Sequence, residues 1–339
     1  MRRLRIALVL AAVLALSALL AACGGSSDKS GESPQTVLEE ATLQGIESGD
    51  VDLTLNLSAP GSEGGKVDIA LSGPFQGEGQ GRLPQLSMTA TAQGKFDGRK
   101  VDFDGGLTLL PNTAYVRYEG TEYEVDPTTF SFVEQTLKQA QRESGAETGA
   151  AGVAGCQEEL GKLKVADFLE GGKNEGATDV GGTSTTKVSG ELNVSGAIDS
   201  LLEVLESRPC RSQLAAAGPL PSQAEIEKAE GEISSAVKKP RVSVYVGDDD
   251  IVRRISADLT VEPQHGGKGP KSVTAGFDLK LTGVNEEQTI SAPQSARPLS
   301  KLFLKLGINP IELLGLLQGE ESGESLGELF EGLAGGASQ

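Results

Sequence analysis

The sequence has no tryptophan, one histidine and few aromatic residues, which make up 4% of the chain. With a single histidine, His265, zinc sites built from several histidines are excluded. Basic residues are also scarce, because 30 Lys and Arg stand against 48 Asp and Glu and the formal net charge is −18. A chain with this charge repels phosphate backbones, so nucleic acid is not an expected partner.

Sequence motifs that signal catalysis are also missing. No phosphate-binding loop or dinucleotide fingerprint is present, and His265 lies in a Gly- and Pro-rich stretch typical of a loop. The run Asp248-Asp249-Asp250 could attract calcium, but it lacks further carboxylates at the spacing of a calcium-binding loop. We expect it to form a solvated hairpin turn. The sequence thus predicts a binding protein without catalytic residues, metal or cofactor.

Residues 1–22 have the order of features found in a bacterial secretory signal. Arginines at the start precede an apolar run from Ile6 to Ala22 that is short for a permanent membrane span. The run ends in Leu-Ala-Ala before Cys23 and resembles the lipobox of bacterial lipoproteins, in which the cysteine is lipid-modified and becomes the first residue. An ordinary secretory signal or a single anchor is the alternative. We expect a lipid anchor on Cys23 at the extracytoplasmic face of the cell membrane.

Composition divides the rest of the chain into three parts. Residues 23–35 hold the lipidated cysteine and a Gly/Ser-rich stretch expected to be a flexible tether. Residues 36–298 are expected to form one folded domain with a mobile insertion at about 143–155. Residues 299–339 are a Leu-rich tail with amphipathic segments, which can dock on the protein itself, on a membrane or on a partner. Its glutamates disfavour an anionic membrane, so we favour docking on the protein itself.

Two cysteines remain once Cys23 is assigned to the lipid. Cys156 and Cys210 form an even pair in a compartment where disulfides persist, and we predict a bridge between them. Free thiols or a redox pair are the alternatives, but there is no Cys-x-x-Cys spacing. The bridge would close a loop of about 55 residues and stabilise the fold by roughly 4 kcal/mol.

Most of the domain alternates apolar and polar residues, which is the period of a β-strand with one buried face. Strands are expected near residues 51–57, 67–71, 86–92, 101–109, 113–118, 122–125, 177–180, 183–194, 241–246, 251–261 and 272–281. Helices are expected at 36–49, after Pro127, at 197–207 and at 223–237. The predicted fold class is α+β, with about ten antiparallel strands interrupted by helices.

The apolar side of such a sheet must be covered by helices of the chain or by a bound apolar ligand. We take the inward strand positions as the candidate ligand pocket. Each of them can equally be ordinary core. The candidates are Leu53, Leu55, Val67, Ile69, Met88, Val101, Phe103, Leu107, Val244 and Phe277.

Several segments resemble lipoproteins of the LppX/LprG/LprF group and, more distantly, the LolA/LolB and RseB-like fold. They are the lipobox cysteine and residues 110–117, 122–127, 181–190, 242–255 and 290–293, and the likeness covers residues 36–298. The resemblance implies a strongly curved antiparallel sheet, an incomplete barrel, with helices packed on its concave face and an apolar cavity between them. It also implies binding of an acylated lipid or lipoglycan and its carriage across the cell envelope.

A second function is compatible with the same fold. The chain would then be a non-carrier envelope lipoprotein that senses or docks a protein partner, as RseB-like domains do. A continuous apolar void of several hundred Å³ would favour the carrier, whereas a sheet face filled by side chains would favour the docking module.

Overall fold

A computed structural model of the chain describes residues 29, 31–61, 64–79, 82–96, 98–131, 134–135, 159, 163–207, 210–211, 236–262 and 272–307. Within these residues, no helix is long and apolar enough to cross a membrane. Cys23, Cys156, the predicted insertion, residues 223–235 of the predicted helix and the tail beyond Gly307 lie outside them. The helix was predicted to end at Val237, but Val237 is the first residue of a strand.

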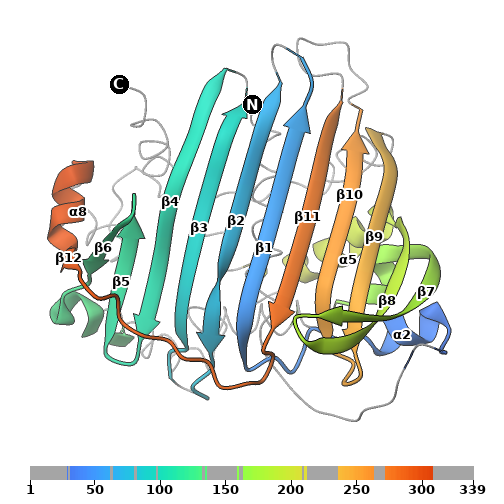
Figure 1. Cartoon of the computed structure of the whole chain (residues 1–339), viewed down its shortest axis with the longest axis horizontal. Coiled ribbons are helices and arrows are strands. Elements are labelled where there is room, and N and C mark those ends of the chain that lie inside the picture. The colour runs from blue at the N-terminus through green and yellow to red at the C-terminus, as the bar shows by residue number, and fades with distance from the viewer. Residues whose placement is uncertain are drawn as a thin grey trace.

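A single large sheet dominates the fold (Figure 1). Its twelve strands lie in the order β12-β6-β5-β4-β3-β2-β1-β11-β10-β9-β8-β7, and all neighbours are antiparallel except β12 and β6. The strands are β1 (Ser48–Ala59), β2 (Gly65–Gln76), β3 (Gln85–Phe96), β4 (Arg99–Leu110), β5 (Thr113–Tyr118), β6 (Thr121–Glu124), β7 (Leu169–Val180), β8 (Thr183–Leu192), β9 (Val237–Gly247), β10 (Val252–Val261), β11 (Val273–Thr282) and β12 (Arg297–Pro298).

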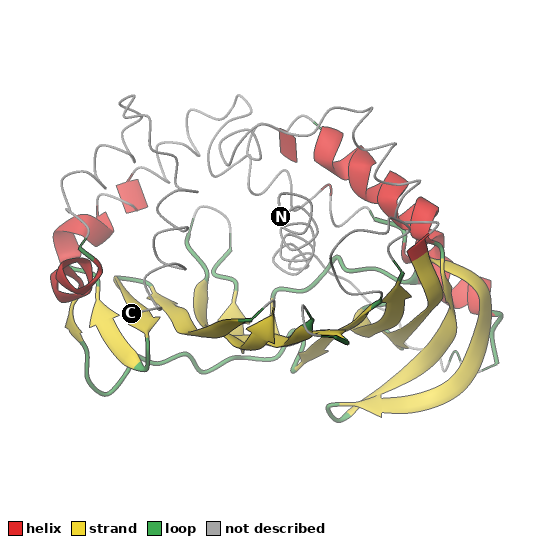
Figure 2. Ribbon diagram, turned by 90° about the horizontal axis from the view of Figure 1, so that it is seen from above, coloured by secondary structure: helices red, strands yellow, loops and turns green. Residues whose placement is uncertain are grey.

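The first and last long strands of the chain meet in the middle of the sheet. β1 pairs with β2 on one side and with β11 on the other, so a meander of β1 to β6 joins a second group of β7 to β11. β12 and β7 are the two edges and do not pair with each other. The sheet is therefore open, and Figure 2 shows that it is bent. This confirms the predicted incomplete barrel of antiparallel strands.

The described helices are short and lie at the two ends of the sheet. They are α2 (Pro34–Glu40), the 3₁₀ helix η1 (Val165–Phe168), α5 (Val194–Glu206) and α8 (Leu299–Leu306). The helix predicted after Pro127 is also found, at residues 127–131 and 134–135. Figure 2 shows α8 near one end and α5 near the other, both on the same side of the sheet. Side-chain caps start two of them, because Ser33 accepts a hydrogen bond from the amide of Thr36 and Asn193 accepts one from Gly196.

The core lies on one face of the sheet, in two adjoining clusters. One packs β1 and β11 against the ends of β2 and β3 and includes Ile46, Val51, Phe75 and Leu281. The other packs Val37 and Leu38 of α2 and Val165 of η1 against valines of β8, β9 and β10. Helices and sheet thus bury their apolar surfaces together, which is the main favourable contribution to folding.

Two elements differ from their predicted limits. The helix expected at 36–49 ends at Glu40, because Thr42 forms a β-bridge with Ile251 and Gly45 has a φ of 92°, in the left-handed region. β7 begins at Leu169, well before the predicted strand at 177, because the polar and Gly-rich residues 170–176 pair with β8 without an alternating pattern.

Candidate functional site

The register of the sheet brings all ten candidate residues to one face. Leu55 of β1 lies opposite both Ile69 of β2 and Phe277 of β11, and Met88 of β3 lies opposite Leu107 of β4. Directly opposite residues point to the same side of a sheet, and so do alternate residues along a strand. The same pairings place Leu53, Val67, Val101, Phe103 and Val244 on this side, which we call the apolar face.

The other side of the sheet is polar and held by cross-strand ion pairs. Arg254 of β10 donates Nε and Nη2 hydrogen bonds to the carboxylate of Asp278 on β11. These hydrogen bonds outweigh the desolvation of Arg254 and raise the pKa of its guanidinium. Arg117 and Asp104 make a similar pair between β5 and β4. This polar face leaves the apolar face as the surface that needs a cover.

Burial divides the ten residues into three groups. Leu53, Val67 and Val244 are core residues, with exposed fractions of 4%, 8% and 1%. Phe103 and Leu107 are exposed, at 45% and 43%. The remaining five are half-buried: Leu55, Ile69, Met88, Val101 and Phe277. Side chains of the apolar face are thus buried on β1 and β9, and their exposure to solvent increases toward β4.

The exposed part of the apolar face has a defined shape on β4. Gly105 lies between Phe103 and Leu107 on the same face, opposite Tyr118 of β5. The Phe103 ring covers this glycine, and Lys305 of α8 stacks on the Tyr118 ring with its Nζ 5.1 Å from the ring centroid. Lys305 also pairs with Glu119. The end of α8 therefore borders the exposed apolar residues.

Two hollows on the described part of the sheet are lined by residues other than these ten. One of about 540 Å³ is lined by Gly64, Gly65, Lys66, Asp68, Gly94, Lys95 and Gly98. The other, of about 730 Å³, is lined mostly by charged and hydroxyl side chains of β7, β8 and β9, including Glu175, Lys187 and Arg241. The apolar face is therefore best described as a partly exposed surface, and a closed apolar cavity stays a prediction.

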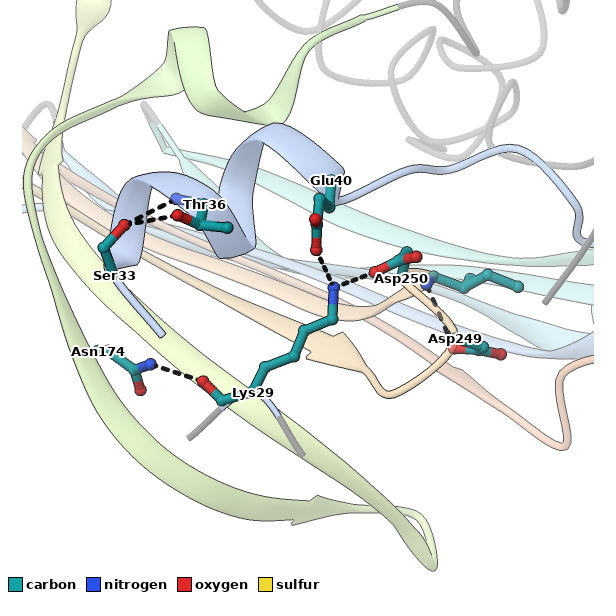
Figure 3. A network of polar contacts seen from close by, with 8 residues as sticks. Lys29, Ser33, Thr36, Glu40, Asn174, Asp249 and Asp250 are labelled. Atoms are coloured by element: carbon teal, nitrogen blue, oxygen red, sulfur yellow. Dashed lines mark hydrogen bonds and ion pairs between the residues drawn. The ribbon is translucent and has the colours of Figure 1, made fainter. Parts of the chain in front are cut away.

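A network of polar contacts holds the start of the described chain to the sheet (Figure 3). Lys29 is 3% exposed and pairs with Glu40 of α2, at 2.7 Å from Nζ to Oε2, and with Asp250. The amide nitrogen of Asn174 donates to the backbone carbonyls of Lys29 and Glu32, both at 3.0 Å. A buried ammonium requires such partners. The tether was predicted to extend to residue 35, whereas the structure attaches the chain to the sheet already at Lys29.

The triple-aspartate turn between β9 and β10 takes part in this network. It forms the predicted hairpin turn, but it is more than a solvated loop. Asp249 pairs with Arg253 at 2.6 Å, and Asp250 pairs with Lys29. Burial lowers the pKa of Lys29, but the hydrogen bonds that Lys29 donates to Asp250 and Glu40, together with the charges of these carboxylates, outweigh it and raise the pKa. Within the described ranges, no cluster of three His, Cys, Asp or Glu is placed to hold a metal ion.

Cys210 is fully buried and is disulfide-bonded. It packs with Val204 of α5 and with Leu163. Its predicted partner, Cys156, lies outside the described residues, so this pairing stays a prediction. Cys23 lies outside them as well, and its lipid modification also stays a prediction.

The sequence matches no protein-family model and no curated protein. Among solved structures, the fold is similar to LprF from Mycobacterium bovis, with a TM-score of 0.34, 16% identity, and 80% of this chain and 100% of that chain covered. It is also similar to the lipoprotein LppX from Mycobacterium tuberculosis, with a TM-score of 0.29, 11% identity, and 73% and 91% covered. A LolA superfamily protein from Nitrosomonas europaea overlaps with a TM-score of 0.17, 6% identity, and 76% and 97% covered. Two of these three structures are members of the lipoprotein group that the sequence resembles.

Proposed function

We propose that this chain is an envelope lipoprotein, anchored to the membrane through Cys23, that binds the acyl chains of a lipid or lipoglycan and carries it across the envelope. The observation that supports this most directly is the apolar face, which runs across β1 to β4 and β9 to β11 and leaves Phe103 and Leu107 exposed to solvent. The proposal involves no catalytic step, metal or cofactor.

The energetics of transfer favour an acyl ligand on such a surface. Each methylene removed from water contributes about 0.8 kcal/mol, so two chains with about 30 methylenes gain on the order of 20 kcal/mol before the costs of binding are subtracted. The exposed and half-buried residues on β1 to β4 and β11 would provide the contact. No charged group is needed for retention.

The lipid itself can be recovered from the protein. We expect mass spectrometry of organic extracts to detect a lipid bound to protein purified from its native membrane and absent from a mock preparation. If no lipid exceeds the mock level, the carrier function is contradicted. The anchor is tested separately, because Cys23→Ala should move the protein from the membrane to the soluble fraction, and unchanged retention would contradict lipidation.

A protein-docking or sensing module is the second candidate. Two observations favour it: Leu53, Val67 and Val244 are packed as core, and both hollows are lined mainly by polar residues or glycine. In that case an envelope protein would cover Phe103 and Leu107. Purified protein would carry no lipid, and Leu107→Gln would abolish capture of the protein partner.

A further inference from the structure

The attachment of the chain at Lys29 limits how the folded domain can sit on a membrane. Lys29 is held by two carboxylates and Asn174 and is almost inaccessible to solvent. Only six Cα–Cα steps separate it from Cys23. Six steps of extended chain span at most roughly 20 Å.

This attachment point lies at one end of the strands. Asp250 belongs to the β9–β10 turn, and its neighbour Ile251 bridges to Thr42. Ile251 also packs with Leu281, whose strand pairs with the start of β1. The β3–β4 hairpin lies at the opposite end, where Phe96 faces Arg99. β1 has 12 residues, and strands of this length measure about 40 Å. The far hairpin is therefore beyond the reach of a linker that ends at Lys29.

We propose that the end of the domain formed by the β9–β10 turn and α2 is its membrane-proximal surface, and that the Lys29 ion pairs set this orientation. The inference rests on the proposed lipid anchor at Cys23. A lipid bilayer is the partner of this surface, since the anchored residue must lie in one.

Ion pairs lower the negative charge of this surface, which also carries Asp248 and Glu39. Anionic headgroups repel carboxylates that lie within a Debye length of the membrane, which is about 8 Å at physiological salt. The triple-aspartate turn would lie close to them, but Asp249 is paired with Arg253 and Asp250 with Lys29. These pairs lower the negative charge that the turn presents to the bilayer.

Fluorescence quenching in vesicles tests the orientation. A thiol fluorophore is placed on full-length lipidated protein at Asp248→Cys, in the proximal turn, or at Arg99→Cys, in the distal hairpin. The vesicles are phosphatidylcholine doped with lipid that carries a nitroxide on its headgroup. We expect the label at 248 to lose most of its emission and the label at 99 to keep most of it. Lys29→Met should reduce the quenching at 248, whereas Lys173→Met, which removes an exposed lysine, should leave it unchanged.

The outcomes separate the orientation from the anchor. If both positions are quenched equally, and the Cys23→Ala variant is released from the vesicles, the inference about orientation is overturned while the anchor stands. Quenching at 248 that does not change in Lys29→Met would overturn the role of the ion pairs. If the Cys23→Ala protein stays bound to the vesicles, the anchor is wrong and the inference falls with it.

Discussion

The ring of Phe103 lies directly over Gly105 on strand β4. A Cβ atom added to Gly105 would come within 2.5 Å of Cζ of that ring, so only glycine lets the ring lie against the strand. The ring is nevertheless 45% exposed. A large aromatic side chain therefore packs against the strand and is presented on the open part of the apolar face.

The first prediction concerns the shape of this surface. Gly105→Ala should push the Phe103 ring away from the strand at little cost in stability, because the atom displaced is the far end of a side chain. We expect the affinity for a fluorescent fatty acid to fall by up to about tenfold, equivalent to about 1.4 kcal/mol. Thr108→Val, on the polar face, removes a hydrogen bond to Ser87 but should leave the affinity for the fatty acid unchanged.

A polar substitution at an exposed position of the apolar face should weaken ligand binding more than it lowers the free energy of unfolding. Leu107 is 43% exposed, and substitutions at such positions usually change the free energy of unfolding by less than about 1 kcal/mol. Leu107→Gln should therefore leave the urea midpoint nearly unchanged but weaken fatty-acid binding. Unchanged affinity in a folded Leu107→Gln protein would place the lipid elsewhere.

The buried part of the same face should respond in the opposite way. Leu53 is 4% exposed and belongs to the core cluster of β1 and β11. Leu53→Ala should lower the free energy of unfolding by about 2–5 kcal/mol, because it leaves a cavity as well as removing apolar contacts. Urea denaturation measures this loss, and a loss below about 1 kcal/mol would show that the site is not tightly packed.

Asp50 should reduce stability at neutral pH. Burial, followed by the charge of Asp52, raises the pKa of Asp50, while Lys280 opposes this shift. The folded state then binds the proton more tightly than the unfolded state, so this contribution is present below about pH 4 and is lost as pH rises through the raised pKa. Asp50→Asn should increase the urea midpoint at pH 7 but not at low pH.

A matched variant is available on the same strand. Asp52 lies 3.4 Å from Lys280, as measured from Oδ2 to Nζ. Asp52→Asn removes this ion pair and should not stabilise the protein at pH 7. If both variants shift the midpoint equally, general charge reduction, and not the environment of Asp50, is the cause.

The disulfide should stabilise the region around α5. Peptide mapping without reduction should link the peptides that contain Cys156 and Cys210. Cys210→Ser should lower the free energy of unfolding by roughly 4 kcal/mol on the chain-entropy account. A mapped bridge between Cys210 and any other cysteine would contradict the predicted pairing.

The sequence predicts local structure better than long-range contacts. Alternation is sufficient to place Leu55, Met88 and Phe277 on strands, and the register then brings them to one face. Two features carry no local signal: the pairing of β1 with β11, and the contact of Lys29 with Asp250, which lies 221 positions later. Both depend on how the two halves of the sheet meet.

The alternating sequence pattern also does not show which residues of the apolar face are exposed to solvent. Leu53 and Leu107 have the same side chain and the same strand periodicity, yet one is 4% exposed and the other 43%. Leu53 belongs to a buried cluster that includes Ile46 and Ile251, which come from segments outside its own strand, whereas Leu107 belongs to no described core cluster. The fold class could be predicted, whereas the open part of the candidate site could not.

Photo-crosslinking tests the location of the ligand most directly. A fatty acid with a diazirine near the end of its chain is bound to the purified protein, irradiated, and the modified residues are identified by mass spectrometry. The proposed function predicts labels on apolar-face residues of β3 and β4, among them Met88, Phe103 and Leu107, and none on the opposite face. Labels on polar-face residues such as Thr89, Asp104 and Thr108, or no specific labelling, would contradict it.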